Sequence, residues 1–267
     1  MKKQRKIIIV IYFLLTLVGL AGIFFTKEEE NIEEKVFLAM IAQGVHDEEL
    51  ECLKARAILL RTNLVEYEAE TVLATPKQLD AFMKADYGGQ KYRKVKKAIE
   101  ETKGMILLYE GKVVFLPFHG VSCGITRAAG EITGESYGYI KSASCKNDIW
   151  ADAYIQIRKY SKKEFPGLLT VQERFESGYV KSISIGDDVY TGEEFRVLYN
   201  LPSACFYIEE IDSGYRILIK GRGHGVGMSL NMASELAKNG YSAMDILNYF
   251  FLGLSPALYE QGEVCPY

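Results

Sequence analysis

Apolar residues recur at a helical spacing through the first third of the chain. The stretch from Glu48 to Glu70 shows this best, because its apolar residues fall on one stripe of a helix. That stripe consists of Leu50, Leu53, Ala57, Leu60 and Leu64. Shorter helices are predicted from Lys35 to Val45, from the capping pair Thr75-Pro76 to Lys84, and from Tyr92 to Thr102.

After Gly104 the pattern changes to short runs of strand-forming residues. Two runs flank Glu110-Gly111 and predict a hairpin, Met105–Tyr109 with Lys112–Pro117. Further strands are predicted at Tyr154–Lys159, Tyr179–Ile185, Cys205–Ile211 and Tyr215–Lys220, and helices at Glu193–Tyr199, Val226–Lys238 and Ala243–Phe251. Since helices come early and strands come in runs, the pattern favours an α+β fold, with a helix-rich segment before a core that contains antiparallel sheet.

One further apolar run lies at the N-terminus. Ile7 to Phe25 carries no charge and is long enough to span a bilayer. The basic Lys2–Lys6 segment precedes this run and the acidic Glu28–Glu30 segment follows it, so the N-terminus is expected in the cytoplasm. No small-residue cleavage site follows, which favours an uncleaved transmembrane helix over a signal peptide. We predict a leader and single-pass anchor at 1–26, a linker at 27–34, and one extracytoplasmic domain at 35–267.

Composition narrows the choice of partners. The net charge is −3 and the pI about 5.8, with basic residues spread along the chain, so nucleic acid is not expected as a partner. The five cysteines show no CxxC spacing. His119, Cys123 and Cys145 together offer imidazole and thiolate ligands for zinc. A disulfide between Cys123 and Cys145 is the alternative in an extracellular protein. No other cofactor is indicated.

Residues 221–229 read G-R-G-H-G-V-G-M-S and precede an apolar, helix-like run. Glycine lets the backbone approach a ligand closely or adopt positive φ, and the first turn of a helix offers unpaired N–H groups. The loop therefore suits a polysaccharide or an anionic group, with Arg222 and His224 as binding residues and Ser229 at its end. The spacing lacks the Gly-Lys-Ser/Thr ending of a phosphate-binding loop. A tight turn packed under a strand is the alternative.

Three other segments accompany this Gly-rich loop. Residues 51–62 read E-C-L-K-A-R-A-I-L-L-R-T, residues 118–126 read F-H-G-V-S-C-G-I-T, and residues 139–142 read Y-I-K-S. Together with the loop they resemble the motifs of the stage II sporulation protein D / LytB family, in the same order along the chain. The resemblance covers approximately residues 35–255.

That resemblance implies a peptidoglycan lytic transglycosylase. In such enzymes one glutamate protonates the glycosidic oxygen, and its carboxylate then takes a proton from the C6 hydroxyl of the sugar, which closes an anhydro ring. The family's glutamate is separated by seven residues from the helix motif that begins here at Glu51. Gln43 occupies that position, in Ala42-Gln43-Gly44. An amide cannot donate and retake a proton at neutral pH, so we predict impaired cleavage.

Other residues of these motifs have candidate roles. Asp47, Glu48 and Glu49 are the nearest acids that could replace the missing one, although acids in a first helical turn are ordinary capping partners. Glu51 is expected to pair with Arg61 or Lys54, as a structural or cleft-lining contact. His119 and Thr126 are candidates for the substrate cleft or for the core. The family's loop continues S-Q-Y-G-A, whereas Ser229 is followed here by L-N-M-A.

The resemblance and the anchor together suggest a membrane-anchored protein that binds peptidoglycan strands during sporulation, in septal thinning and engulfment. The family works with stage II sporulation proteins M and P, which are therefore expected partners. Two alternatives remain open at this point. One is an active lytic transglycosylase that uses Glu48 or Glu49, and the other is a scaffold that activates a partner hydrolase.

Overall fold

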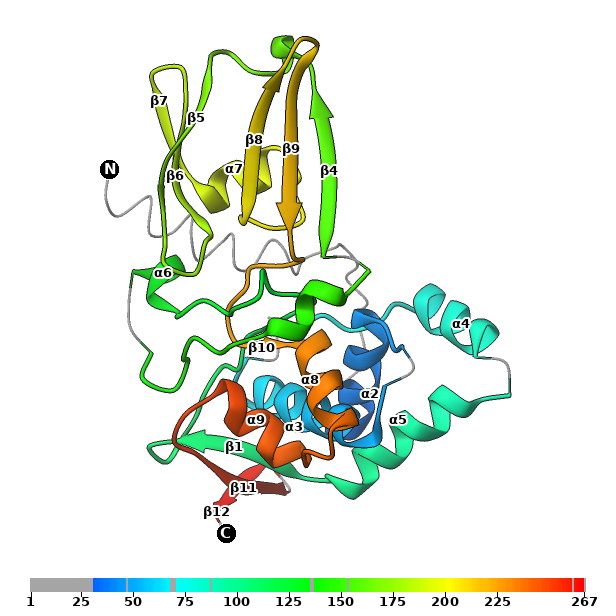
Figure 1. Ribbon diagram of the computed structural model, residues 1–267. Coiled ribbons are helices and arrows are strands. Elements are labelled where there is room, and N and C mark those ends of the chain that lie inside the picture. Colours follow the sequence, from blue (N-terminus) through cyan, green and yellow to red (C-terminus); the bar gives the residue numbers. More distant parts are fainter. Residues whose placement is uncertain are drawn as a thin grey trace. The chain divides into compact units, whose positions relative to one another are not determined.

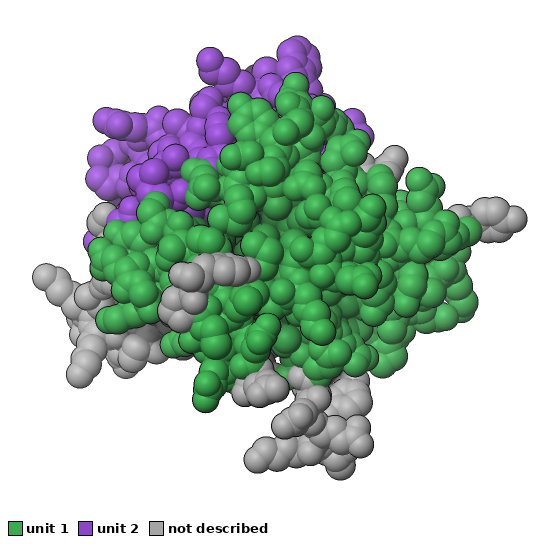
Figure 2. All heavy atoms as spheres, turned by 90° about the horizontal axis from the view of Figure 1, so that it is seen from below, with its two compact units in different colours: residues 1–116, 237–248, 253–267 green, residues 117–236, 249–252 purple. Residues whose placement is uncertain are grey.

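The computed structural model describes residues 31–46, 48–67, 71–86, 88–134, 137–152, 154–260 and 262–266. Contacts within the chain form two compact units, coloured separately in Figure 2: residues 1–116, 237–248 and 253–267, and residues 117–236 and 249–252. From the sequence, residues 35–267 are expected to form one domain. The predicted anchor lies outside the described residues, and none of the helices described is long and apolar enough to cross a membrane.

The first unit is built around helix α3, which runs from Leu50 to Glu66 and is buried along most of its length. It packs against α2 (Ile32–Gln43), α5 (Gln90–Glu101) and strand β1 (Met105–Tyr109). Helix α4 (Pro76–Ala85) begins with the predicted cap, since the side chains of Thr75 and Gln78 form a capping box. All four predicted helices of this region are confirmed. Helix α2 begins earlier than predicted, inside the segment taken as a linker, because Asn31 caps it.

The sheet of the first unit joins residues 105–113 to the C-terminal residues 254–266. Its order is β12-β11-β1-β2, with β2 at Lys112–Val113, β11 at Leu254–Glu260 and β12 at Glu263–Pro266. The predicted hairpin between β1 and β2 is confirmed, and Glu110 and Gly111 both have positive φ, as a tight hairpin turn requires. Strand β11 pairs along the whole of β1 and was not predicted from the sequence.

Two antiparallel sheets of three strands form much of the second unit (Figure 1). Their orders are β4-β9-β8 and β5-β6-β7. The strands are β4 (Ile155–Tyr160), β5 (Leu169–Arg174), β6 (Val180–Ile185), β7 (Asp188–Thr191), β8 (Phe206–Ile211) and β9 (Gly214–Lys220), with helix α7 (Gly192–Leu198) after β7. The mixed α+β class is thereby confirmed.

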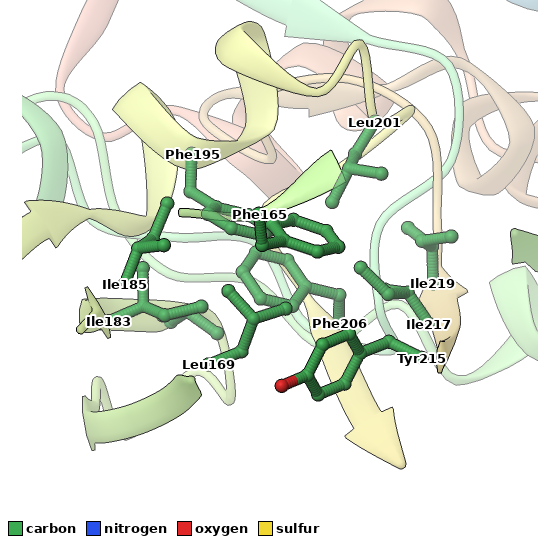
Figure 3. Close-up of a cluster of buried hydrophobic side chains, with 11 residues drawn as sticks. Phe165, Leu169, Ile183, Ile185, Phe195, Leu201, Phe206, Tyr215, Ile217 and Ile219 are labelled. Atoms are coloured by element: carbon green, nitrogen blue, oxygen red, sulfur yellow. The ribbon is translucent and has the colours of Figure 1, made fainter. Parts of the chain in front are cut away.

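One apolar cluster holds the two sheets together. Figure 3 shows side chains from both sheets and from α7 pointing into it, among them Ile183, Phe195, Phe206 and Ile217. Each of these four is fully buried. Burial of a large apolar side chain contributes about 1.5–3 kcal/mol, so the cluster stabilises this part of the unit substantially.

The remainder of the second unit is mostly irregular and carries the Gly-rich loop. Strand β3 (Phe118–His119) pairs in parallel with β10 (Met228–Ser229), and α8 (Leu230–Lys238) follows directly. The helix predicted from Val226 therefore begins later, because the preceding residues pair with strands. Short helical turns occur at α6 (Gly130–Thr133), η2 (Lys146–Trp150) and η3 (Lys162–Glu164). Helix α9 (Ala243–Phe250) belongs mostly to the first unit.

Candidate functional site

The Gly-rich loop, residues 221–229, depends on glycine for its path. Gly225 has φ of +79°, and a Cβ there would collide with the hydroxyl of Tyr179. Gly227 has φ of +73°, and a Cβ there would collide with the carbonyl of Pro117. Any other residue would be strained in this backbone region and would also clash. The tight packing considered from the sequence is thus present in the loop.

Backbone hydrogen bonds fasten the loop to its neighbours. Arg222 and Val121 exchange two of them, with N···O distances of 2.7 and 3.1 Å. The N–H of Arg127 donates to the carbonyl of Gly225 at 2.7 Å. The loop is therefore fixed, while the side chain of Arg222 is exposed and that of His224 is half-buried. Arg222 presents a permanent positive charge to solvent from a rigid backbone.

Asp148, in η2, organises the end of the loop. It is fully buried, and its carboxylate accepts hydrogen bonds from the Ser122 backbone N–H at 2.7 Å, from Ser229 Oγ at 2.7 Å and from Asn231 Nδ2 at 3.0 Å. A buried carboxylate is tolerated only when it is hydrogen-bonded in this way. Sequence reasoning missed Asp148 because a single aspartate in a polar stretch carries no pattern.

The ring of His224, in the loop, lies next to the ring of His119, with centroids 5.7 Å apart. His119 is buried, and its Nδ1 lies 3.1 Å from the carbonyl of Val226, which places the proton on Nδ1. Within the described residues its Nε2 has no hydrogen-bond partner. Burial lowers the pKa of His119 to about 4, against an opposing effect of the Asp148 charge. This ring is therefore neutral at pH 7.

His224 shows the opposite protonation. Its Nδ1 accepts a hydrogen bond from the Val226 N–H at 3.1 Å, so the proton belongs on Nε2. Burial holds its pKa well below the usual value, and the neighbouring His119 and Arg196 act in the same direction. A neutral imidazole contributes hydrogen bonds rather than charge, which leaves Arg222 as the cation of the loop.

Arg127 is a second residue that the sequence did not single out. It is buried, and its guanidinium donates to Glu193 at 2.7 Å and to Glu131 at 3.3 Å, while lying 4.6 Å from the ring centroid of Tyr179. It also contacts the carbonyl of His224 at 3.4 Å. Both carboxylates and the aromatic face offset its buried charge. Arg127 thus supports the loop from beneath.

Thr126 and Ser229 are fully buried, and both are bonded within the protein. Thr126 Oγ1 accepts a hydrogen bond from Ala143 N–H at 2.8 Å, and Ser142 Oγ donates to the Thr126 carbonyl at 2.6 Å. The motif segments 118–126 and 139–142 are therefore joined directly. His119 and Ser229 hold the loop through Val226 and Asp148, whereas the side chains of Arg222 and His224 are at least partly exposed.

The cysteines form neither of the predicted arrangements. All five are free thiols, so the disulfide between Cys123 and Cys145 is not formed. Burial raises the pKa of Cys145 to about 12, whereas a hydrogen bond with Cys205 lowers the pKa of Cys123. Nowhere in the described ranges are three His, Cys, Asp or Glu side chains grouped as a metal ion requires. The zinc site of His119, Cys123 and Cys145 therefore finds no support.

The first unit contains the position expected to carry the acid. Gln43 is the last residue of α2 and is partly buried, and Gly44 ends the helix with φ of +85°. Glu48 is buried and accepts hydrogen bonds from Arg56 at 2.7 and 2.5 Å. Arg56 also donates to the carbonyl of Gly44 at 3.0 Å. Glu49 is exposed, and Asp47 lies outside the described residues.

The remaining motif residues of the first unit have structural contacts. Arg61 is fully buried and pairs with Glu33 at 2.5 Å, and it donates to the carbonyl of Met105 at 3.0 Å. Glu51 pairs with Lys54 at 2.8 Å and accepts a hydrogen bond from the Ala243 N–H at 2.9 Å. Of the two partners considered for Glu51, the structure selects Lys54.

Comparison with known proteins agrees with these motifs. A family model described as stage II sporulation protein matches residues 29–109, which include Gln43 and helix α3. Stage II sporulation protein D of Bacillus amyloliquefaciens is 28% identical over 256 residues, covering 84% of this chain and 74% of that protein. The chain is similar to stage II sporulation protein D over most of its length. The resemblance inferred from the sequence motifs is thereby confirmed.

Two further relatives show a comparable similarity. Stage II sporulation protein D of Bacillus subtilis (strain 168) is 27% identical over 231 residues, covering 76% of this chain and 67% of that protein. An uncharacterized protein of Brachyspira hyodysenteriae (strain ATCC 49526 / WA1) is 27% identical over 254 residues, covering 87% of this chain and 68% of that protein. The similarity thus extends well beyond the region of the family model.

Proposed function

We propose that this protein binds the glycan strands of peptidoglycan outside the cytoplasmic membrane, and that it cleaves them slowly or not at all. In this proposal residues 7–25 anchor it, and it acts in septal thinning and engulfment together with stage II sporulation proteins M and P. The observation that carries the binding function is the Gly-rich loop, which is fixed from beneath and presents Arg222 to solvent. Glycan stripped of stem peptides retains a lactyl carboxylate on alternate sugars, which a guanidinium can bind through paired hydrogen bonds.

The proposal of slow cleavage rests on Gln43. Loss of general acid and base assistance typically costs about 10² to 10⁴ in rate, and a mechanism that depends on one acid should lie at the upper end. Glu48 is a poor replacement, because its carboxylate is buried and both of its oxygens already accept hydrogen bonds from Arg56. Glu49 is exposed, whereas a catalytic acid of this kind usually lies in a partly buried cleft.

Two other functions predict different experimental results. An active lytic transglycosylase would release anhydro-sugar products from the unmodified protein, with Glu48 or Glu49 supplying the proton. A scaffold that activates a partner hydrolase would need no glycan contact and would leave sedimentation with glycan unaffected by changes in the loop.

The binding function is tested with the full-length protein in detergent and denuded peptidoglycan sacculi. Arg222→Ala should weaken co-sedimentation about tenfold, since a charge-assisted hydrogen bond is worth about 1.5–3 kcal/mol. Arg158→Ala is the matched control, because Arg158 is an exposed arginine of β4 in the same unit. Equal binding by both variants and the parent would favour the scaffold.

A further inference from the structure

Asp148 and Tyr154 are hydrogen-bonded to the two ends of the Gly-rich loop. At one end, Asp148 accepts the hydrogen bonds from Ser229 and Asn231. At the other, the carbonyl of Tyr154 accepts a hydrogen bond from the N–H of Gly221 at 2.7 Å. Both residues are thus bonded to positions on either side of Arg222 and His224.

Trp150 lies between these two attachments and is 81% exposed. It is the single tryptophan of the chain. A tryptophan side chain can bury 150–250 Å² of surface, and soluble proteins usually bury most of it. Trp150 sits at the end of the η2 turn, whose backbone is closed by the hydrogen bond from Ala151 N–H to the Asp148 carbonyl at 3.1 Å. The ring is therefore displayed from an ordered backbone.

We propose that Trp150 is a sugar-binding residue that stacks on a pyranose ring of the glycan strand, beside the part of the strand held at the Gly-rich loop. This inference rests on the proposed glycan-binding function and extends it to a second contact. The flat indole face matches the apolar C–H face of a pyranose, and the indole N–H can donate to a hydroxyl or an N-acetyl carbonyl.

The surroundings of Trp150 favour a sugar over a dry protein or lipid contact. Lys146 is exposed at the start of the η2 turn, and Asp152 is exposed two residues after its end. Removing these two charges from water in an apolar interface would be costly. A glycan would leave them hydrated or hydrogen-bond to them through its hydroxyls. Ile149 is 42% exposed beside the ring and adds apolar area, so a protein partner is the outcome that the test must separate.

The test uses the intrinsic fluorescence of the full-length protein in detergent, because Trp150 is the sole indole and every change in its emission reports this site. Soluble denuded glycan strands should shift the emission to shorter wavelength and should saturate at the concentration that half-saturates sedimentation. Trp150→Ala should weaken sedimentation about tenfold, and Trp150→Phe should retain most of the affinity. Ile149→Ala, which removes apolar area without a ring, should bind like the parent. Since Trp150 is exposed, thermal unfolding of its variants should match that of the parent.

The outcomes separate this inference from the function on which it rests. If the parent sediments with glycan while its emission stays constant and Trp150→Ala binds equally well, Trp150 is not a sugar-binding residue and the glycan-binding function stands. If the parent does not sediment with glycan, both fail. An emission change with phospholipid vesicles but not with glycan would assign the ring to a membrane surface. Equal losses of glycan sedimentation for Ile149→Ala and Trp150→Ala would show that general apolar area, and not stacking by the indole ring, carries the contact.

Discussion

At the scale of single residues, the proposed loss of glycan cleavage depends on residue 43. Gln43 lies at the end of α2, partly buried, and Arg56 donates to the carbonyls of both Met40 and Gly44 around it. The backbone at this position is thus held in place. Glutamine and glutamate have nearly equal volume, so their exchange changes proton chemistry without altering packing.

Gln43→Glu should therefore produce a measurable lytic transglycosylase. The introduced carboxyl would be partly desolvated at the position that the family resemblance assigns to the acid, which raises its pKa toward the working pH. We expect release of anhydro-sugar glycan fragments about 10² or more above the parent, measured by mass spectrometry of the soluble products.

Gln43→Leu is the matched control, because it has similar volume and no proton to give, and it should release no more than the parent. Comparable release by the unmodified protein would show that another acid carries the reaction and that the protein is an enzyme. If neither form cleaves, the departures from the family loop at Leu230 and Met232 become the next residues to change.

At the scale of elements, one glycine precedes helix α8 and another follows it, and the two differ in the space available for a Cβ. Gly227 precedes the helix with φ of +73°, and a Cβ would collide with Pro117. Gly240 follows it with φ of +85° and has open space around a Cβ. Its N–H donates to the carbonyl of Ala237 at 3.0 Å, as a glycine at a helix C-terminus commonly does.

Alanine at the two positions should therefore have unequal effects. Gly240→Ala costs only the left-handed conformation, about 1–2 kcal/mol of unfolding free energy. Gly227→Ala adds a backbone clash worth about 1–3 kcal/mol or more, so it should lose clearly more stability. Urea unfolding followed by circular dichroism measures both. Equal losses would mean that the loop can shift away from Pro117, and that its path is less tightly defined than the structure shows.

At the scale of the whole molecule, the chain is expected to lie almost entirely outside the cytoplasmic membrane. The charges that flank the run at 7–25 support this orientation, since basic residues precede it and acidic residues follow it. Protease added to intact protoplasts should remove the 35–267 region. A cytoplasmic marker protein should survive until the protoplasts are lysed. Full protection of the 35–267 region in intact protoplasts would rule out this topology and, with it, access to the cell wall.

Much of the fold could be predicted from the sequence because its signals are local. Helical spacing, the Thr75-Pro76 cap and the Glu110-Gly111 turn each act within a few residues, and the structure contains the helices and the hairpin that they indicate. Strand β11 was missed because it contains Pro256, which usually argues against an inner strand. Pro256 lies opposite Leu107 of β1, and the pairing of β11 with β12 begins only at Ala257. The N–H that proline lacks therefore removes no hydrogen bond between β11 and β12.

In the candidate site, too, some features could be predicted from the sequence and others could not. The sequence by itself determined the Gly-rich loop, its Arg222 and His224, the family resemblance and the amide at residue 43, because these depend on residue type and order. Only the tertiary structure decided that Asp148 fastens the loop, that Thr126 and Ser229 are buried, and that Arg61 pairs with Glu33 rather than Glu51. Such contacts join residues far apart in the chain, and they depend on burial and distance, which a linear pattern does not encode.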